Sequence, residues 1–355
     1  MIGVSLLTLN PEAVGGTLTY ARELVRALGR VGELEYRVFA PSIAPEAGEG
    51  LPSTVVREYR ASRTTPGRFA GLAAAALAPG RVRRALLAAD LDAIHFPLGV
   101  MLPRLDSPPA AATIHDLQHE AFPQFFSRGQ LAYRRRVYGW TVQRSRIVIT
   151  DSEHGRDVVV ERLGIDPQRV RAIHLAVDHQ RFTPGEGPRE PFLLYPANRW
   201  PHKNHDRLFE AFALVRRERP ELRLVLTGAG HERFSVLPPG VETEGLVPLD
   251  RVVELYRTAA ALVYPTLYEG FGLPALEAMA CDCPIAVSCV TSLPEICGEA
   301  AVYFDPSSVE DIARGIVEVL ERPPSGGPAR AAGFTWDRCA REHDAVYREL
   351  ADGAR

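Results

Sequence analysis

The stretch TLYEGFGLPALEAMACDCP, residues 266–284, combines a glycine-rich loop with two carboxylates, Glu269 and Glu277. Gly270 and Gly272 leave backbone N–H groups accessible, and the Leu-Pro step after them suits the first turn of a helix. A loop of this kind ahead of a helix favours an anionic ligand such as phosphate. The helix dipole stabilises Glu277 even without a ligand. Glu269 precedes Gly-Phe-Gly, where helix capping is not available, so its carboxylate needs another role.

A second stretch, YPANRWPHKNHDRLFEAF, gathers basic side chains between the end of an expected strand and the start of a helix. Cations beside a helix N-terminus form an anion site, in which Lys203 acts as a point charge on a phosphate. Asn204 is expected to cap the helix. The alternative is a solvated basic turn. The basic residues are Arg199, His202, Lys203 and His205.

Two loops in the first half of the chain also follow expected strands. In NPEAVGGTLTYARELV, Gly15 and Gly16 allow a close backbone approach to a ligand, although a plain tight turn also explains them. In TIHDLQHEAFP, His115 and Asp116 are expected at the carboxyl end of a strand. An imidazole bonded to a backbone carbonyl is one alternative for His115. A metal site with His119 is another, but no third ligand is evident.

These loops belong to a regular alternation of short β-rich runs and longer amphipathic segments, which predicts two doubly wound parallel sheets. A Pro- and Gly-rich stretch at 180–192 reads as a linker between an N-terminal Rossmann-like domain, 1–185, and a second one, 186–330. We expect the two domains to face each other across a cleft, with a final helix at 336–351. The expected strands are 1–9, 35–40, 92–97, 110–116, 146–152, 192–197, 222–228, 261–265, 283–289 and 300–305.

The composition excludes several classes of protein. A net charge of −3 argues against a dedicated nucleic-acid binder. The N-terminus has no basic region of a signal peptide, and no apolar run is long enough to span a bilayer. The five cysteines lack the C-x-x-C spacing of a zinc or redox site, so reduced thiols in a cytoplasmic protein are expected. No G-x-G-x-x-G follows the first strand, which disfavours an NAD-dependent dehydrogenase.

Taken together, these motifs resemble the retaining glycosyltransferases of family four, which have the GT-B fold. The most specific signature is E-x7-E, here Glu269 to Glu277 within EGFGLPALEAMAC. The resemblance continues through CPIAVSCVTSLPEICGEAAVYFDP, VGGTLTYARELVRAL, IHDLQHEAFP, VITDSEHGRDVV and YPANRWPHKNH, and covers essentially the whole chain. The last helix, in FTWDRCAREHDAVY, resembles the family's helix that crosses back onto the first domain.

The resemblance implies roles for the residues of the second domain. Lys203, with Arg199, would hold the donor diphosphate and stabilise the leaving group. Glu269 would accept hydrogen bonds from the donor sugar, and Glu277 would bind the ribose hydroxyls. Backbone amides that reach the sugar and phosphate would come from Gly270, Phe271, Gly272 and Leu273.

In the first domain, the resemblance implies that Gly15 and Gly16 let the backbone approach the diphosphate. His115 would lie at the reacting sugar, and Asp116 would orient its loop. The expected catalytic residues are His115, Lys203 and Glu269. Two positions depart from the family pattern: Asp282 replaces a common Gly, and His202 replaces a common Arg before Lys203.

The expected function is transfer of a hexose, mannose from GDP-mannose in the first instance, from a nucleotide-diphosphate sugar to a glycan or lipid-linked acceptor. The expected mechanism is front-face substitution with retention, with no metal and no cofactor besides the donor. Alternatives are UDP-glucose or another donor, or a non-catalytic nucleotide-sugar-binding protein. Arginines at 57–84 and 128–146 suggest peripheral contact with the inner face of a membrane, with a solvated helix face as the alternative.

Overall fold

The computed structural model describes residues 1–12 and 15–353, which form two compact units. The first unit comprises Met1–Leu175 together with Trp336–Arg355, and the second comprises Ala176–Thr335. Residues 176–185, which the sequence analysis assigns to the first domain, therefore lie in the second unit. They are held there because Val177 N–H donates to the carbonyl of Phe334 and Arg257 Nε donates to the carbonyl of Thr183, at 3.4 and 2.8 Å.

The first unit is built on a parallel sheet whose seven described strands run in the order β3-β2-β1-β4-β5-β6-β7. Chain order reverses between β1 and β4, which makes the carboxyl ends of these strands the expected place for a ligand. The strands are β1 (Ile2–Ser5), β2 (Tyr36–Pro41), β3 (Ser53–Val56), β4 (Ala93–Phe96), β5 (Ala110–Ile114), β6 (Ile147–Thr150) and β7 (Val170–Ala172). The helices are α1 (Gly16–Val31), α2 (Thr65–Leu77), α3 (Gly80–Leu87), α4 (Gln118–Ala121), α5 (Arg128–Arg144), α6 (Glu153–Leu163) and α13 (Trp336–Asp352), with short 3₁₀ turns at Pro123–Phe125 and Pro167–Arg169.

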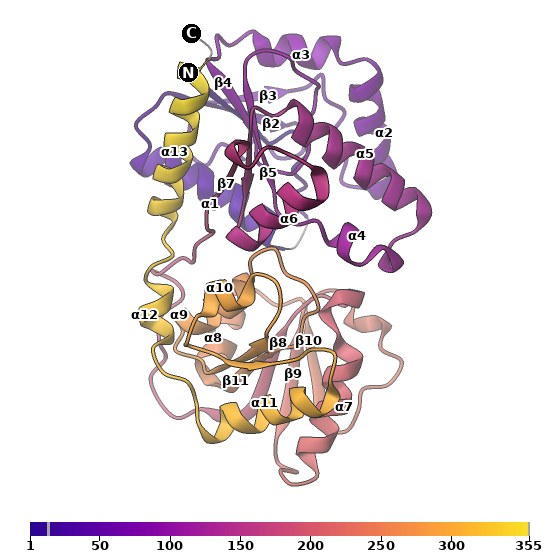
Figure 1. Ribbon diagram of the computed structural model, residues 1–355, viewed down its shortest axis with the longest axis vertical. Helices are drawn as coiled ribbons and strands as arrows, with labels where there is room; N and C mark the ends of the chain where they lie inside the picture. The colour runs from indigo at the N-terminus through magenta and orange to yellow at the C-terminus, as the bar shows by residue number, and fades with distance from the viewer. Residues whose placement is uncertain (13–14, 354–355) are drawn as a thin grey trace. The chain divides into compact units, whose positions relative to one another are not determined.

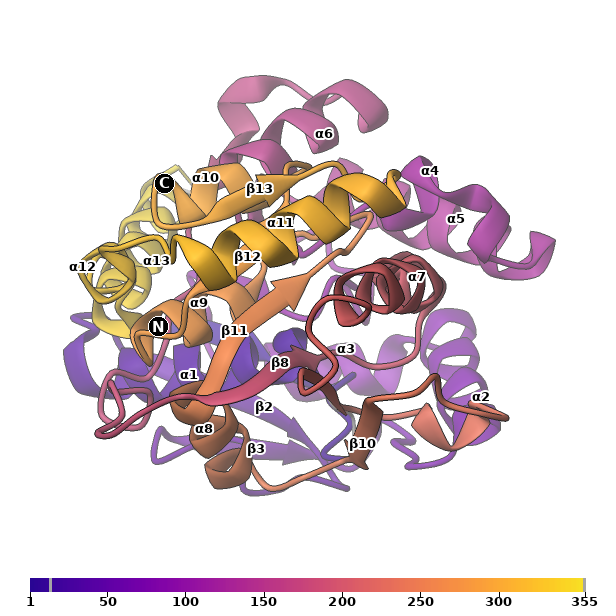
Figure 2. The same ribbon diagram turned by 90° about the horizontal axis from the view of Figure 1, so that it is seen from below.

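The second unit has a parallel sheet of six described strands in the order β10-β9-β8-β11-β12-β13. Helices α7 and α11 pack together on one face, with α8 and α9 on the other (Figure 2). The strands are β8 (Glu190–Pro196), β9 (Arg223–Thr227), β10 (Val241–Gly245), β11 (Ala259–Tyr264), β12 (Ile285–Ser288) and β13 (Val302–Phe304). The helices are α7 (His205–Arg216), α8 (Leu249–Thr258), α9 (Leu273–Ala280), α10 (Leu293–Cys297), α11 (Val309–Glu321) and α12 (Gly327–Ala331), with 3₁₀ turns at Pro201–Lys203 and His231–Arg233.

Both sheets confirm the predicted doubly wound parallel class. Strands β1, β4, β5, β6 and β12 are completely buried, because a parallel sheet is covered by helices on both faces and its strands read as continuous apolar runs. Chain order in the second sheet reverses between β8 and β11, so the carboxyl ends of these two strands form its switch point.

Helix α13 belongs to the first unit although the second unit precedes it in sequence. It packs against α1 (Figure 1), as the predicted return of the chain to the first domain requires. A buried chain of hydrogen bonds joins α13 to β4, β5 and α1. In order, it passes through Tyr347, His95, Thr113, Tyr20 and His343, with successive distances of 2.8, 2.8, 2.9 and 2.8 Å.

The donor and the acceptor of each hydrogen bond in this buried chain can be assigned, starting from its last member, His343. His343 Nδ1 lies 2.8 Å from the carbonyl oxygen of Cys339, which can only accept, so Nδ1 carries a hydrogen. Burial lowers the pKa of His343 to about 4, and the neutral ring then accepts a hydrogen bond from Tyr20 at Nε2. Burial also lowers the pKa of His95, so each group donates to the next, starting from the Tyr347 hydroxyl. Protonation of either histidine would place two donors face to face.

Candidate active site

The predicted site residues of the second unit gather at the carboxyl ends of β8 and β11, on either side of the switch point. Lys203 ends the 3₁₀ turn after β8, and Glu269 lies in the loop after β11. Lys203 Nζ donates to Glu269 Oε1 at 2.5 Å and to the Tyr264 hydroxyl at 2.9 Å. The Tyr264 hydroxyl in turn donates to Glu269 Oε1 at 3.0 Å. A cation, a carboxylate and a phenol are therefore linked to one another by three hydrogen bonds.

This ion pair is largely removed from water, since the Lys203 and Glu269 side chains are 11% and 13% exposed. Burial alone would raise the pKa of Glu269, but the charges of Lys203 and His202 together with the hydrogen bond from Lys203 outweigh burial, and the pKa is lowered. Glu269 is thus a carboxylate at neutral pH. An anion arriving at Lys203 would compete with Glu269 for the ammonium and release the carboxylate for other hydrogen bonds.

The loop that carries Glu269 is fixed by the segment after β12. Thr291 Oγ1 accepts from the Glu269 N–H at 3.1 Å, and Ser292 Oγ donates to the carbonyls of Glu269 and Phe271 at 3.2 and 2.9 Å. Gly272 has φ +103°, and a Cβ there would lie 2.6 Å from Leu293 Cδ2. Glycine is therefore required where the loop turns into α9. Sequence reasoning assigned no role to Thr291 or Ser292.

The predicted cationic cluster after β8 is smaller than its sequence suggests. His202 and His205 are buried, and burial lowers the pKa of His205 to about 3, so its ring is uncharged. Arg199 is exposed, with its guanidinium 4.5 Å from the Phe234 ring centroid and Nη1 3.3 Å from the carbonyl of Arg233. Arg199 and Lys203 are the members of the cluster that can meet an anion.

Asn204 occupies the N-cap position of α7, but its predicted capping hydrogen bond is wrong. It has φ 58°, and its side-chain amide donates to the carbonyls of Pro265 and Pro306 at 3.0 and 2.8 Å. The side chain therefore ties the loop after β8 to the segments after β11 and β13. This tie holds Lys203 close to the Glu269 loop.

Glu277 is the fifth residue of α9, so it lies beyond the first turn, where the helix dipole would stabilise it. Its Oε2 accepts from the Tyr256 hydroxyl at 3.0 Å. Burial raises the pKa of Glu277 to about 7. Burial that raises the pKa of a carboxyl group costs folding free energy at neutral pH. A cost of this kind favours a functional role for Glu277.

Asp282, where the family pattern has a common glycine, has a structural explanation. Helix α9 ends in a Schellman motif, in which the N–H of Asp282 donates to the carbonyl of Met279 and the N–H of Cys283 to that of Ala278, at 3.0 and 2.9 Å. The position requires the left-handed conformation, and Asp282 adopts it with φ 56°. Aspartate tolerates this region better than most residues. Its exposed side chain belongs to the turn.

In the first unit, Gly15 and Gly16 lie at the start of α1, and both are exposed. Gly15 is the N-cap with φ 142°, a conformation that other residues rarely adopt, and no side chain caps the helix. Thr17 lies inside α1 and does not cap it. The first amides of α1 lack intrahelical acceptors and point out of its N-terminus.

His115 follows β5, and both of its ring nitrogens have partners. Nδ1 lies 2.8 Å from Asp151 Oδ2, and Nε2 lies 2.9 Å from the carbonyl oxygen of Pro97. The predicted bond to a backbone carbonyl is therefore present, together with a carboxylate that sequence reasoning missed. Asp116 accepts from the Gln118 N–H at 3.1 Å and so fixes the turn into α4.

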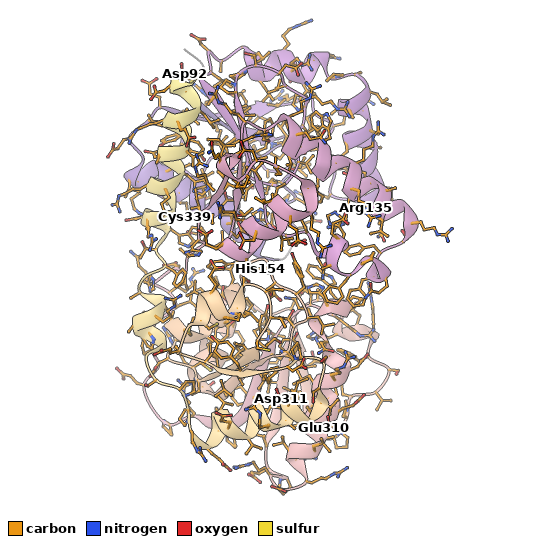
Figure 3. All side chains as sticks on the ribbon, in the orientation of Figure 1. Asp92, Arg135, His154, Glu310, Asp311 and Cys339 are labelled. Carbon is orange, nitrogen blue, oxygen red and sulfur yellow. The ribbon has the colours of Figure 1, made fainter. Side chains whose placement is uncertain are left out.

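The alternative of a metal site on His115 and His119 finds no geometric support. His119 is buried, and its ring stacks on Tyr138 with centroids 5.1 Å apart. Within residues 1–12 and 15–353, no three His, Cys, Asp or Glu side chains are placed to hold a metal ion. Asp90 and Asp92 are two residues apart, a spacing that can hold a metal ion, but they precede β4 at the end of the strand opposite the site. Asp92 (Figure 3) pairs with the N-terminal amine of Met1.

The arginine-rich segment 128–146 forms α5, and several of its side chains are already engaged. Arg135 (Figure 3) makes a bidentate ion pair with Glu120, in which Nε and Nη2 donate to Oε1 and Oε2 at 2.9 and 3.1 Å. Arg134 lies over the Phe126 ring, 4.8 Å from its centroid. In the described part of the chain, no helix combines the length and apolar character needed to cross a bilayer.

Comparison with known proteins divides the chain much as its fold does. Residues 177–332 match a family model described as Glycosyl transferases group 1, and residues 14–181 match one described as Glycosyltransferase Family 4. Among curated relatives, O-antigen chain mannosyltransferase B of Escherichia coli is 29% identical over 273 residues, which cover 68% of this chain and 70% of the relative.

Solved structures share the fold over nearly the full length. Sucrose-phosphate synthase from Thermosynechococcus elongatus superposes with a TM-score of 0.78 at 20% identity and covers 99% of both chains. The Anabaena protein HepE, solved in complex with UDP and glucose, gives a TM-score of 0.71 at 13% identity and covers 98% of this chain and 99% of its own. At these identities the likeness concerns the fold.

Proposed function

This chain belongs to the glycosyltransferases of group 1 and family 4 and has the GT-B fold, and we propose that it transfers a hexose from a nucleotide-diphosphate sugar with retention of configuration. The observation that carries this proposal is the pairing of Lys203 with Glu269 at the switch point of the second sheet. A cation for the diphosphate and an acceptor for sugar hydroxyls stand side by side there. The E. coli relative is named a mannosyltransferase, which supports mannose from GDP-mannose as the donor.

In the proposed reaction, the bond between the anomeric carbon and the diphosphate oxygen breaks as the acceptor oxygen bonds to the same face of that carbon. The acceptor's proton passes to the departing phosphate oxygen. Lys203, Arg199 and the first amides of α9 stabilise the charge that grows on the diphosphate, so the proposal assigns no metal. Lys203 leaves Glu269 for the phosphate, and Glu269 then accepts hydrogen bonds from the sugar. Glu277 binds the ribose diol.

A second candidate donor is UDP-glucose or another nucleotide hexose, and the HepE complex with UDP and glucose favours it. The acceptor is proposed to be a glycan or a lipid-linked sugar. Contact with anionic lipid through the exposed arginines of α5 belongs to the same proposal. Its support is reduced because Arg134 and Arg135 already have partners inside the unit.

The donor can be identified by thermal shift with GDP-mannose, UDP-glucose, ADP-glucose and dTDP-glucose. A donor at 100 times its Kd should stabilise the folded protein by about 2.7 kcal/mol, because it binds only the native state. We expect GDP-mannose to raise Tm most. A melt that none of the four shifts, with the protein folded, would contradict the proposed function.

Glu277→Gln should stabilise the unliganded protein at pH 8 and at the same time weaken nucleotide binding. The pKa of Glu277 is about 7 in the fold, against 4.5 as its ordinary value, so stability is lost as pH rises between these values. Glutamine does not titrate, and removing the penalty should gain up to about 3 kcal/mol above pH 7. Loss of a charged acceptor should weaken nucleotide binding about tenfold or more.

The two effects of Glu277→Gln are measured by urea unfolding and by calorimetric titration with the nucleotide. Glu254→Gln is a matched control, because Glu254 is an exposed carboxylate on α8 paired with Arg251. It should change neither quantity by more than a few tenths of a kcal/mol. Nucleotide affinity unchanged by Glu277→Gln would remove the ribose role.

A further inference from the structure

His115 and Asp151 form a buried pair whose position follows directly from the sheet. Strands β5 and β6 are neighbours, and Ile114 is aligned with Thr150, so the next residue of each strand stands at the same carboxyl edge. The side chains of His115 and Asp151 are 15% and 4% exposed and lie 2.8 Å apart. The ring therefore meets a carboxylate on one side and, at Pro97, the end of β4 on the other.

The protons of this pair can be assigned from its acceptors. A carbonyl oxygen only accepts, so the bond to Pro97 requires a hydrogen on Nε2. An ionised Asp151 also only accepts, so the other bond requires a hydrogen on Nδ1. With both bonds made, His115 is an imidazolium. A ring in this state has no lone pair with which to remove a proton from an acceptor.

The surroundings favour the charged ring. Burial lowers the pKa of His115, but the charge and hydrogen bond of Asp151, with smaller contributions from the Pro97 carbonyl and Asp116, outweigh burial, and the net pKa is raised. Burial also raises the pKa of Asp151, against the charge and hydrogen bond of His115, so the assignment of a charged pair rests on the two hydrogen bonds of the ring. The Tyr20 ring from α1 makes a T-shaped contact with His115, with centroids 5.0 Å apart, and burial raises the pKa of Tyr20, so its phenol is uncharged. The titratable groups around the pair are Asp116 in the same loop, His95 on β4, Tyr20 on α1, His174 after β7, and Cys339 on α13.

We propose that Asp151 is a positioning residue that holds His115 as a fixed imidazolium across the carboxyl ends of β4, β5 and β6. His115 then acts in transfer as a fixed charge and does not act as a general base. The inference rests on the proposed function and on the place at the reacting sugar that the family resemblance implies for His115. It agrees with a reaction in which the leaving phosphate takes the acceptor's proton.

Asp151→Asn removes the negative charge of the Asp151 side chain and keeps its shape. The asparagine amide can donate to Nδ1 while Nε2–H still donates to Pro97, so both hydrogen bonds persist around a neutral ring. We expect kcat at pH 8 to fall about 10- to 100-fold, because the neutral ring no longer brings a fixed positive charge to the transition state. Because the variant ring has a lower pKa, the alkaline limb of its pH–rate profile should shift to lower pH, and activity should recover in part as pH falls.

Nitrogen-15 NMR of the histidine rings tests the same inference without turnover. The His115 resonance is identified by its absence in His115→Asn. At pH 7.5 the wild-type ring should show two N–H groups, and the Asp151→Asn ring one. Asp157→Asn, which removes an exposed carboxylate on α6, is the control and should leave the ring protonated.

The two measurements fail in different ways. A neutral His115 ring in the wild type at pH 7.5 would overturn the inference even if the protein were an active transferase. A charged ring that becomes neutral in Asp151→Asn, with kcat and the pH profile unchanged, would also overturn it, since charge would then play no part in transfer. If no donor is turned over, the proposed function fails, and the NMR result still decides the state of the pair.

Discussion

Lys203→Met is expected to lower kcat by about a thousandfold, since removal of a single stabiliser of transition-state charge costs about 10²–10³ in rate. In this site the loss has a second part. Lys203 is the cation 2.5 Å from Glu269, and without it the largely buried carboxylate loses the charge that lowers its pKa. The pKa of Glu269 should then rise, and the protonated carboxyl is a poorer acceptor for sugar hydroxyls. The rate is measured by steady-state transfer with the donor that thermal shift identifies.

Stability provides an independent check on the Lys203 prediction. Removing one partner of a buried ion pair costs about 3–5 kcal/mol, because the other charge is left uncompensated. Lys203→Met should therefore lower Tm, and adding Glu269→Gln should recover much of that loss without restoring activity. Arg219→Met, which breaks the exposed pair with Glu321 at 2.7 Å, is the matched control and should cost at most about 1 kcal/mol. A Lys203→Met variant that keeps a tenth of the wild-type kcat would contradict the assignment.

The alternation of strands and helices could be predicted because buried parallel strands leave a strong local signal. The final helix, expected at 336–351, is α13 (Trp336–Asp352), and the strands around the switch points were placed within a few residues. Strands β3 and β10 were missed, because these are edge strands with exposed side chains that lack the continuous apolar run of a central strand. Strand β7 was missed because this short edge strand has Arg171 at its centre and so lacks an apolar run.

The candidate site was predictable where residue type and strand position were enough, as for Lys203 and Glu269. It was not predictable where burial decides the chemistry. His202 and His205 read as cations by type, yet tertiary packing buries them. The partner of His115 lies 36 residues away, directly after β6, and only the pairing of β5 with β6 brings it close. A strand order would have been needed to find Asp151 from the sequence.

Acidification is expected to destabilise the first unit through the buried chain that holds α13. His343 and His95 stay neutral in the fold, with the pKa of His343 at about 4, whereas both take up a proton near pH 6.5 when the chain unfolds. The unfolded state therefore binds more protons, and stability is lost as pH falls from about 6.5 toward 4. Each histidine contributes about 1.4 kcal/mol per pH unit in this window, so the two should remove about 3–4 kcal/mol between pH 7 and pH 5.

Urea unfolding of the wild type and of His343→Gln at these two pH values isolates the contribution of one histidine. The variant should be less stable at pH 7, because Tyr20 and the Cys339 carbonyl lose their well-placed partner. It should nevertheless lose about 2 kcal/mol less than the wild type on going to pH 5, because glutamine does not titrate. His179→Gln, at an exposed position, should produce no comparable change. An equal acid loss in the wild type and His343→Gln would mean that the His343 ring is already charged in the fold. The single direction of hydrogen bonds from Tyr347 to Cys339 would then be wrong, because a protonated ring cannot accept from Tyr20.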